Sequence, residues 1–82
     1  MNLKMLKLSE AKVGKTYVVV KIYGKGLMKR RLMDLGIMTK AKLKVVGVAP
    51  LGDPLNIEVN GFNIAIRRNE ASQVIVKEIE EK

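Results

Sequence analysis

Hydrophobic and polar residues alternate in several short segments of this chain, which is the pattern of strands with one buried face. Within Thr16–Tyr23, apolar side chains recur at Val18, Val20 and Ile22, and Gly24 begins a stretch that ends the segment. The alternation predicts a first strand over these residues.

The segment Lys42–Ala49 also alternates, but its pattern changes phase partway along. Leu43 and Val45 share one face, whereas Val46 and Val48 share the other, and a glycine lies between the last two. A β-bulge or a sharp bend explains such a change, and bent strands allow a small sheet to close into a barrel. We therefore predict a second strand that is bent or bulged.

The clearest pattern predicts a hairpin of two strands, Leu55–Asn60 and Phe62–Arg67. Asn60 and Gly61 stand between the two alternating segments, and this dipeptide is a strong signal for a two-residue turn. Such a turn places six apolar side chains on one face, which we expect to be the core face. The cross-strand pairs are Val59 with Phe62, Ile57 with Ile64, and Leu55 with Ile66.

One segment, residues 27–35, has the period of a helix instead. Apolar residues recur at i, i+4 and i+7 from Met28, which places them on one face. Gly36 stands where a left-handed residue ends many helices, and Ile37 follows it. We predict a helix that ends in a Schellman motif, with Ile37 contacting Leu32.

The remaining segments complete a small, mainly β domain. Arg68–Ser72 reads as a short polar connection and Gln73–Ile79 as the last strand. Leu3–Gly14 fits either a helical turn capped by Ser9 or a short edge strand. About five short strands, with one short helix inserted after the first long strand, predict a closed or nearly closed barrel.

The amino-acid composition excludes several classes of function but does not identify one. The chain has 82 residues, which indicates a single domain over residues 1–82, and it has neither cysteine nor histidine. Ser/His and Cys/His catalytic pairs are therefore excluded, and only oxygen ligands remain for a metal. We expect no enzyme activity, cofactor or metal site, and the lack of cysteine favours the cytoplasm. No apolar run is long enough to insert into a membrane.

Gly14, Lys15 and Thr16 resemble the end of a phosphate-binding loop. That loop requires a further glycine where this chain has Ser9, and it requires a helix where the alternation predicts a strand. The tripeptide instead indicates a polar turn in which Gly14 adopts a positive φ.

Charge is distributed unevenly along the chain, whose formal net charge is +8. Residues 1–44 contain 12 Lys/Arg and 2 Asp/Glu, whereas residues 45–82 contain 4 and 6. A basic half favours an acidic protein, a nucleic acid or an anionic membrane surface as partner. The alternative is a lysine-rich surface that only faces solvent.

Several polar and apolar residues around the predicted helix are candidates for partner binding. Methionines outside a core suit adaptable protein-binding surfaces, although both Met33 and Met38 could equally fill the core. The charged residues could equally form an ion pair that joins the helix to the barrel. The proline-rich loop at 50–54 either exposes the apolar side chain of Leu51 at its tip or packs this side chain back on the barrel. The candidates are Lys29, Arg30, Arg31, Met33, Asp34, Met38 and Leu51.

Taken together, these motifs resemble the ferrous iron transport protein A (FeoA) family over about Leu6 to Ile79. The resemblance is carried by Arg30-Arg31-Leu32-Met33-Asp34-Leu35-Gly36-Ile37, Pro50-Leu51-Gly52-Asp53-Pro54, Asn60-Gly61, Ala65-Ile66-Arg67 and Glu70-Ala71. It implies an SH3-like β-barrel and a small cytoplasmic accessory protein of bacterial ferrous iron uptake. The implied partner is the membrane transporter of that system, which carries a cytoplasmic G-protein domain.

A basic nucleic-acid-binding barrel, or a barrel of the kind found in transcriptional regulators, is the alternative function. Small barrels do bind oligonucleotides, but Tyr17, Tyr23 and Phe62 are the only aromatic residues and Phe62 is predicted to lie in the core. Few rings then remain for stacking on bases, which disfavours nucleic acid as a partner. The sequence leaves the oligomeric state open.

Overall fold

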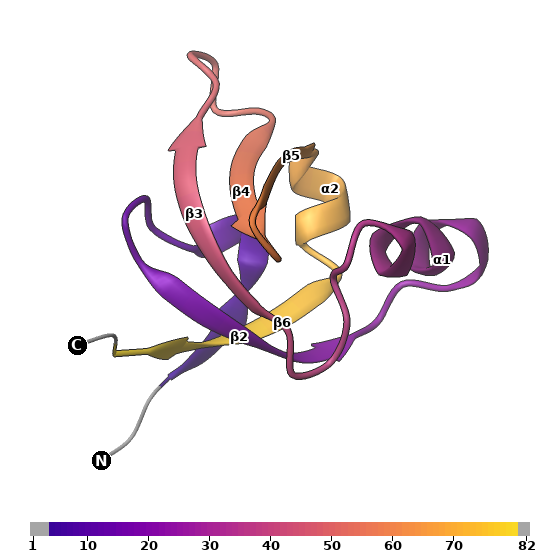
Figure 1. Cartoon of the computed structure of the whole chain (residues 1–82). Coiled ribbons are helices and arrows are strands. Elements are labelled where there is room, and N and C mark those ends of the chain that lie inside the picture. The colour runs from indigo at the N-terminus through magenta and orange to yellow at the C-terminus, as the bar shows by residue number, and fades with distance from the viewer. Residues whose placement is uncertain (1–3, 81–82) are drawn as a thin grey trace.

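The computed structural model describes residues 4–80, which form one curved antiparallel sheet with two helices and a 3₁₀ turn (Figure 1). Six strands lie in the order β1-β6-β2-β3-β4-β5, and the end strands β1 and β5 do not pair with each other. The elements are β1 (Met5–Lys7), the 3₁₀ turn η1 (Leu8–Glu10), β2 (Thr16–Ile22), α1 (Gly26–Asp34), β3 (Lys42–Val48), β4 (Leu55–Val59), β5 (Phe62–Ile66), α2 (Arg68–Ala71) and β6 (Val74–Ile79).

The mainly β fold and the helix inserted after the first long strand are confirmed, with six strands in place of about five. The additional strand is β1, which pairs with β6 and corresponds to the edge-strand alternative for the N-terminal segment. The other alternative, a helical turn capped by Ser9, is wrong, because Ser9 lies inside the 3₁₀ turn itself. Leu3 lies outside the described residues.

Strand β2 buries a different face from the one that its alternation suggested. Val19 is buried, whereas Val18 and Val20 are half-buried. The pairing with β6 shifts register between Val19 and Lys21, and the extra residue returns Ile22 to the core. The local bulge thus changes which residues of the strand face inward.

The predicted irregularity in β3 and the register of the hairpin are both confirmed. The pairing of β3 with β4 shifts between Val45 and Gly47, where the pattern changes phase. The β4–β5 hairpin turns at Asn60 and Gly61, which have φ angles of 53° and 82°, as a type I′ turn requires. All three predicted cross-strand pairs are present: Val59–Phe62, Ile57–Ile64 and Leu55–Ile66.

The predicted burial of Phe62 is wrong. Its side chain is 71% exposed, although it lies on the same face as the buried Ile66. Ile64 between them is half-buried, so burial declines along β5 towards the turn. The core reaches this end of the hairpin on β4, where Val59 is buried opposite Phe62, so the exposure of Phe62 is a property of the edge strand β5.

Helix α1 ends in the predicted Schellman motif. The Ile37 amide donates to the Leu32 carbonyl oxygen at 2.9 Å, and the Gly36 amide donates to that of Met33 at 2.9 Å. Gly36 adopts a φ of +95°, and the chain then directs Ile37 into the core.

One connected apolar core fills the inside of the curved sheet. The predicted polar connection at 68–72 contributes to it, because this segment forms the helical turn α2 and buries Ala71. The buried apolar residues are Leu8, Tyr17, Val19, Ile22, Leu32, Ile37, Leu43, Val45, Leu55, Ile57, Val59, Ile66, Ala71, Val74 and Val76.

We expect Gly36→Ala to destabilise the protein by roughly 1–3 kcal/mol, measured by urea unfolding. A Cβ at Gly36 would lie 2.8 Å from Asn60 Nδ2, and the positive φ adds backbone strain. Gly14→Ala is the matched control, because Gly14 has a similar φ of +91° with nothing within 4 Å of the added Cβ. Equal effects of the two substitutions would show that the contact with Asn60 contributes nothing.

Candidate partner-binding surface

Helix α1 exposes most of its side chains. Among its residues, Leu32 is the one that is fully buried, while Lys29, Arg30 and Asp34 are exposed. The helix lies against one side of the curved sheet, at the end where β2 leads into it and β3 begins (Figure 1). Its exposed residues are therefore free to contact another molecule.

Arg31 has a structural partner. Its Nη1 lies 3.4 Å from Oε2 of Glu70, a buried residue in α2. The other carboxylate oxygen of Glu70 accepts a hydrogen bond from the Arg67 amide at 3.1 Å and so caps α2. An ion pair does join α1 to the rest of the domain, but it runs from Arg31 to Glu70 in α2, and no ion pair of Asp34 occurs within residues 4–80.

Three of the predicted residues meet in one hollow of about 310 Å³, which we call the methionine hollow. Met33 from α1 is 44% exposed, and Met38 from the segment before β3 is 45% exposed, so both belong to the surface rather than the core. The lining residues are Lys21, Ile22, Lys29, Met33, Met38 and Thr39. Flexible, polarizable thioethers beside lysines suit a partner with apolar and acidic side chains.

Lys21 and Thr39 could not be identified from the sequence as members of this hollow. Lys21 belongs to β2, and its Nζ lies 4.8 Å from the centroid of the Tyr23 ring, a cation–π distance. Residues on a strand and in a turn reach the helix only through the tertiary fold, so spacing along the chain could not identify them.

Leu51 lies apart from the methionine hollow. It occupies the loop after β3, at the opposite end of that strand from Met38 (Figure 1). The loop is anchored, because Asp53 Oδ1 accepts a hydrogen bond from the Arg68 amide at 3.1 Å and the Arg68 guanidinium donates to the Gly52 carbonyl oxygen. The side chain of Leu51 is nevertheless 97% exposed.

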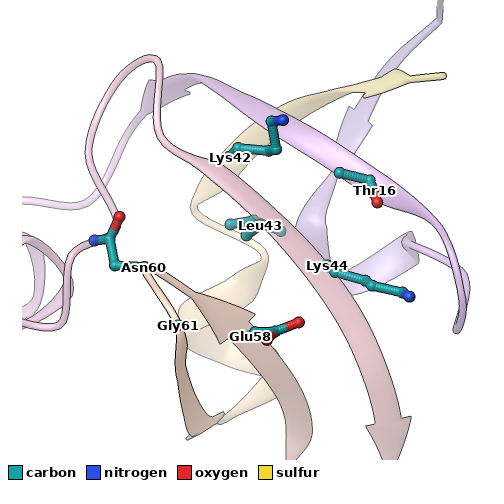
Figure 2. A pocket seen from close by; sticks show the side chains of 7 residues that line it. All are labelled: Thr16, Lys42, Leu43, Lys44, Glu58, Asn60 and Gly61. Atoms are coloured by element: carbon teal, nitrogen blue, oxygen red, sulfur yellow. The ribbon is translucent and has the colours of Figure 1, made fainter. Parts of the chain in front are cut away.

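A second hollow lies over β3 and the β4–β5 turn, as Figure 2 shows. Lys44 and Glu58 are cross-strand partners at its margin, and Leu43 belongs to the core beneath it. Its volume of about 170 Å³ is below the roughly 300 Å³ at which small-molecule pockets begin. This hollow is therefore too small for a typical organic ligand.

A larger hollow, of about 590 Å³, lies beside β1 and β2. Its polar groups partner one another: the Lys12 amide donates to the Tyr17 hydroxyl at 2.9 Å, and Lys15 Nζ lies 3.1 Å from Glu78 Oε2. Nowhere in residues 4–80 do three or more acidic, histidine or cysteine side chains gather in a way that could hold a metal ion.

The architecture defines the class of protein: a small SH3-like domain with one curved antiparallel sheet and one helix inserted after its first long strand. Within the described part of the chain, neither helix has the length and hydrophobicity needed to cross a membrane. The FeoA domain model matches residues 6–78, and the chain belongs to that family of small accessory proteins of ferrous iron transport.

Solved structures of FeoA proteins have the same fold. The solution structure of FeoA from Chlorobium tepidum is 44% identical, with a TM-score of 0.85 over 92% of this chain and 71% of that one. FeoA from Stenotrophomonas maltophilia, crystallised with zinc and described as an SH3 domain protein, is 29% identical. It has a TM-score of 0.76 over 87% of this chain and 88% of its own.

One curated relative joins two components in one polypeptide. It is the Fe(2+) transport protein A/Fe(2+) transporter FeoB fusion protein of Porphyromonas gingivalis, 31% identical over 72 residues. The match covers 88% of this chain but 8% of the fusion protein, so the chain spans a small part of that relative.

We expect Arg31→Glu to lower the free energy of unfolding by about 1–2 kcal/mol and Arg30→Glu to change it by less than about 0.5 kcal/mol. The first substitution places a second carboxylate beside the buried Glu70, whereas Arg30 has no ion pair among the described residues. Chemical denaturation measures both. Arg31→Glu combined with Glu70→Gln should recover part of the loss, and additive losses would contradict a direct interaction.

Proposed function

We infer that this protein acts in the cytoplasm, where it binds the G-protein domain of the membrane ferrous iron transporter and regulates transport. The observation that carries this inference is the relative in which the A protein and the transporter FeoB form one chain. Fusion holds two partners at a high effective concentration, so it is favoured where the separate proteins must meet.

The methionine hollow and the neighbouring charges of α1 are the surface that we assign to this contact. Met33 and Met38 are exposed and lie together in the hollow, with Lys29 at its edge. Arg30 is exposed on the same helix and has no carboxylate partner in residues 4–80. Apolar residues within a positively charged margin favour an acidic partner surface with a few apolar anchors.

Charge reversal at Lys29 and Arg30 together should weaken binding to the isolated G-protein domain of the transporter at least tenfold, measured by calorimetry. The two substitutions replace attraction by repulsion at the margin of the hollow. Met33→Ser should weaken binding by a similar factor through loss of apolar contact, with little change in salt dependence. Lys12→Glu is the matched control, because Lys12 is exposed but lines the hollow beside β1.

The same titrations with GDP and with a GTP analogue test regulation. A difference in affinity between the two nucleotide states means, by linkage, that this protein shifts the nucleotide affinity of its partner by the same factor. If Lys12→Glu weakens binding as much as the α1 variants do, the assigned surface is wrong. If the wild-type protein does not bind the domain in either state, the proposed partner is wrong.

Nucleic-acid binding remains a second candidate function because two aromatic rings are exposed. Tyr23 is 55% exposed and Phe62 is 71% exposed, so rings for stacking on bases are present on a chain of net charge +8. A titration against mixed-sequence DNA and RNA at rising salt tests it. An affinity that falls steeply with salt and with Phe62→Ser supports this function, and no binding at low salt excludes it.

A further inference from the structure

The last strand of the sheet order, β5, has an unpaired backbone edge. In a two-residue type I′ turn, the flanking residues Val59 and Phe62 form a hydrogen-bonded pair, and such pairs alternate along the hairpin. The amide and carbonyl groups of Asn63 and Ala65 therefore point away from β4. Both residues are exposed, and no backbone group of residues 4–80 bonds to their outward groups.

Nothing in the sequence of β5 protects this edge from pairing. Proteins commonly block exposed edges with charged residues, proline, bulges or very short strands. Phe62–Ile66 has no charge, no proline and no register shift in its pairing with β4. The opposite edge strand, β1, is only three residues long and contains Lys7. One edge of the sheet is therefore protected against pairing with another strand, whereas the other edge is not.

The side chains at this edge are also incompletely covered. Phe62 and Ile64 lie on the face of β5 that continues into the core at Ile66, yet Phe62 is exposed and Ile64 is half-buried. An added strand would bring its own side chains beside these two and remove their apolar surface from water. The edge therefore offers backbone hydrogen bonds and an apolar strip together.

The charge near β5 indicates which kind of additional strand this edge can bind. Arg67 directly follows β5, is exposed, and forms no ion pair with any described carboxylate. A second copy of this chain would bring a further net charge of +8, which opposes self-pairing. A segment with acidic residues beside its apolar ones is attracted by the same charges.

We propose that β5 accepts an extended, acidic segment of another protein as an additional antiparallel strand. The segment bonds to the backbone of Asn63 and Ala65, covers Phe62 and Ile64, and places a carboxylate near Arg67. This surface belongs to different elements from the methionine hollow, so the proposal extends the function inferred above and does not depend on it.

The test uses a synthetic peptide of alternating threonine and valine with aspartates at both ends, and a second peptide in which lysines replace the aspartates. The aspartate peptide should slow amide hydrogen exchange at Asn63 and Ala65, followed by NMR, and leave the amides of β1 unchanged. It should bind at least tenfold more tightly than the lysine peptide, and rising salt should reduce this difference.

Two substitutions at position 65 distinguish the contribution of the backbone amide to peptide binding from that of the side chain. Ala65→Pro removes an outward amide without breaking a bond to β4, and should weaken peptide binding about tenfold. Ala65→Ser keeps the amide and should bind as the wild type does. If Ala65→Pro fails to fold, Phe62→Ser serves instead, because it removes apolar contact and leaves the backbone intact.

Three outcomes would overturn the proposal. The two peptides could bind equally well, which removes the role of charge. Exchange could slow at sites other than β5. A dimer that Ala65→Pro dissociates, seen by analytical ultracentrifugation of the free protein, would assign the edge to a second copy. The variant with Lys29 and Arg30 reversed should still bind the aspartate peptide, whatever its affinity for the transporter domain.

Discussion

The burial of Leu32 and Ile37, on either side of the Gly36 turn, holds helix α1 against the sheet. Each fully buried aliphatic side chain contributes about 1.5–3 kcal/mol, and Leu32 is the fully buried side chain within the helix itself. The positive φ of Gly36 is what allows the chain to turn Ile37 inward directly after the helix ends. The other side chains of α1 are exposed except that of Met28, which is half-buried against the core. Met33 and Met38 therefore lie at the surface around the methionine hollow.

The sequence predicted those parts of the fold that depend on neighbouring residues. The hairpin register follows from Asn60 and Gly61, because their positive φ angles produce a turn that fixes every pair beyond it. The bulge in β3 could be located because a change of phase in the alternation marks the extra residue. Burial was harder to predict, and Phe62 shows why. Alternation identifies which residues share a face, but how far the core extends beneath that face depends on the curvature of the whole sheet.

The candidate site was predicted in part, for the same reason. Helical spacing and the helix stop left Met33 and Met38 open between core and surface, and the structure exposes both and brings them together with Lys29. Arg31 was assigned to the same surface, but its partner Glu70 comes from α2, far along the chain, so no local pattern connects them. Glu70 caps α2 through one carboxylate oxygen, and that local role says nothing about the partner of the other oxygen.

The edge of β5 is open for the same reason that Phe62 is exposed, which is that the apolar core of this domain is small. A chain of 82 residues buries a limited fraction of its surface, and here the core includes Val59 on β4 but not its cross-strand partner Phe62 on the edge strand β5. A charged residue in place of Phe62 would make the edge strand more soluble, since the burial of the Phe62 side chain contributes little to the fold. An aromatic residue at a position that the fold does not bury, on a strand that no neighbour covers, is better explained by a contact outside the chain than by packing within it.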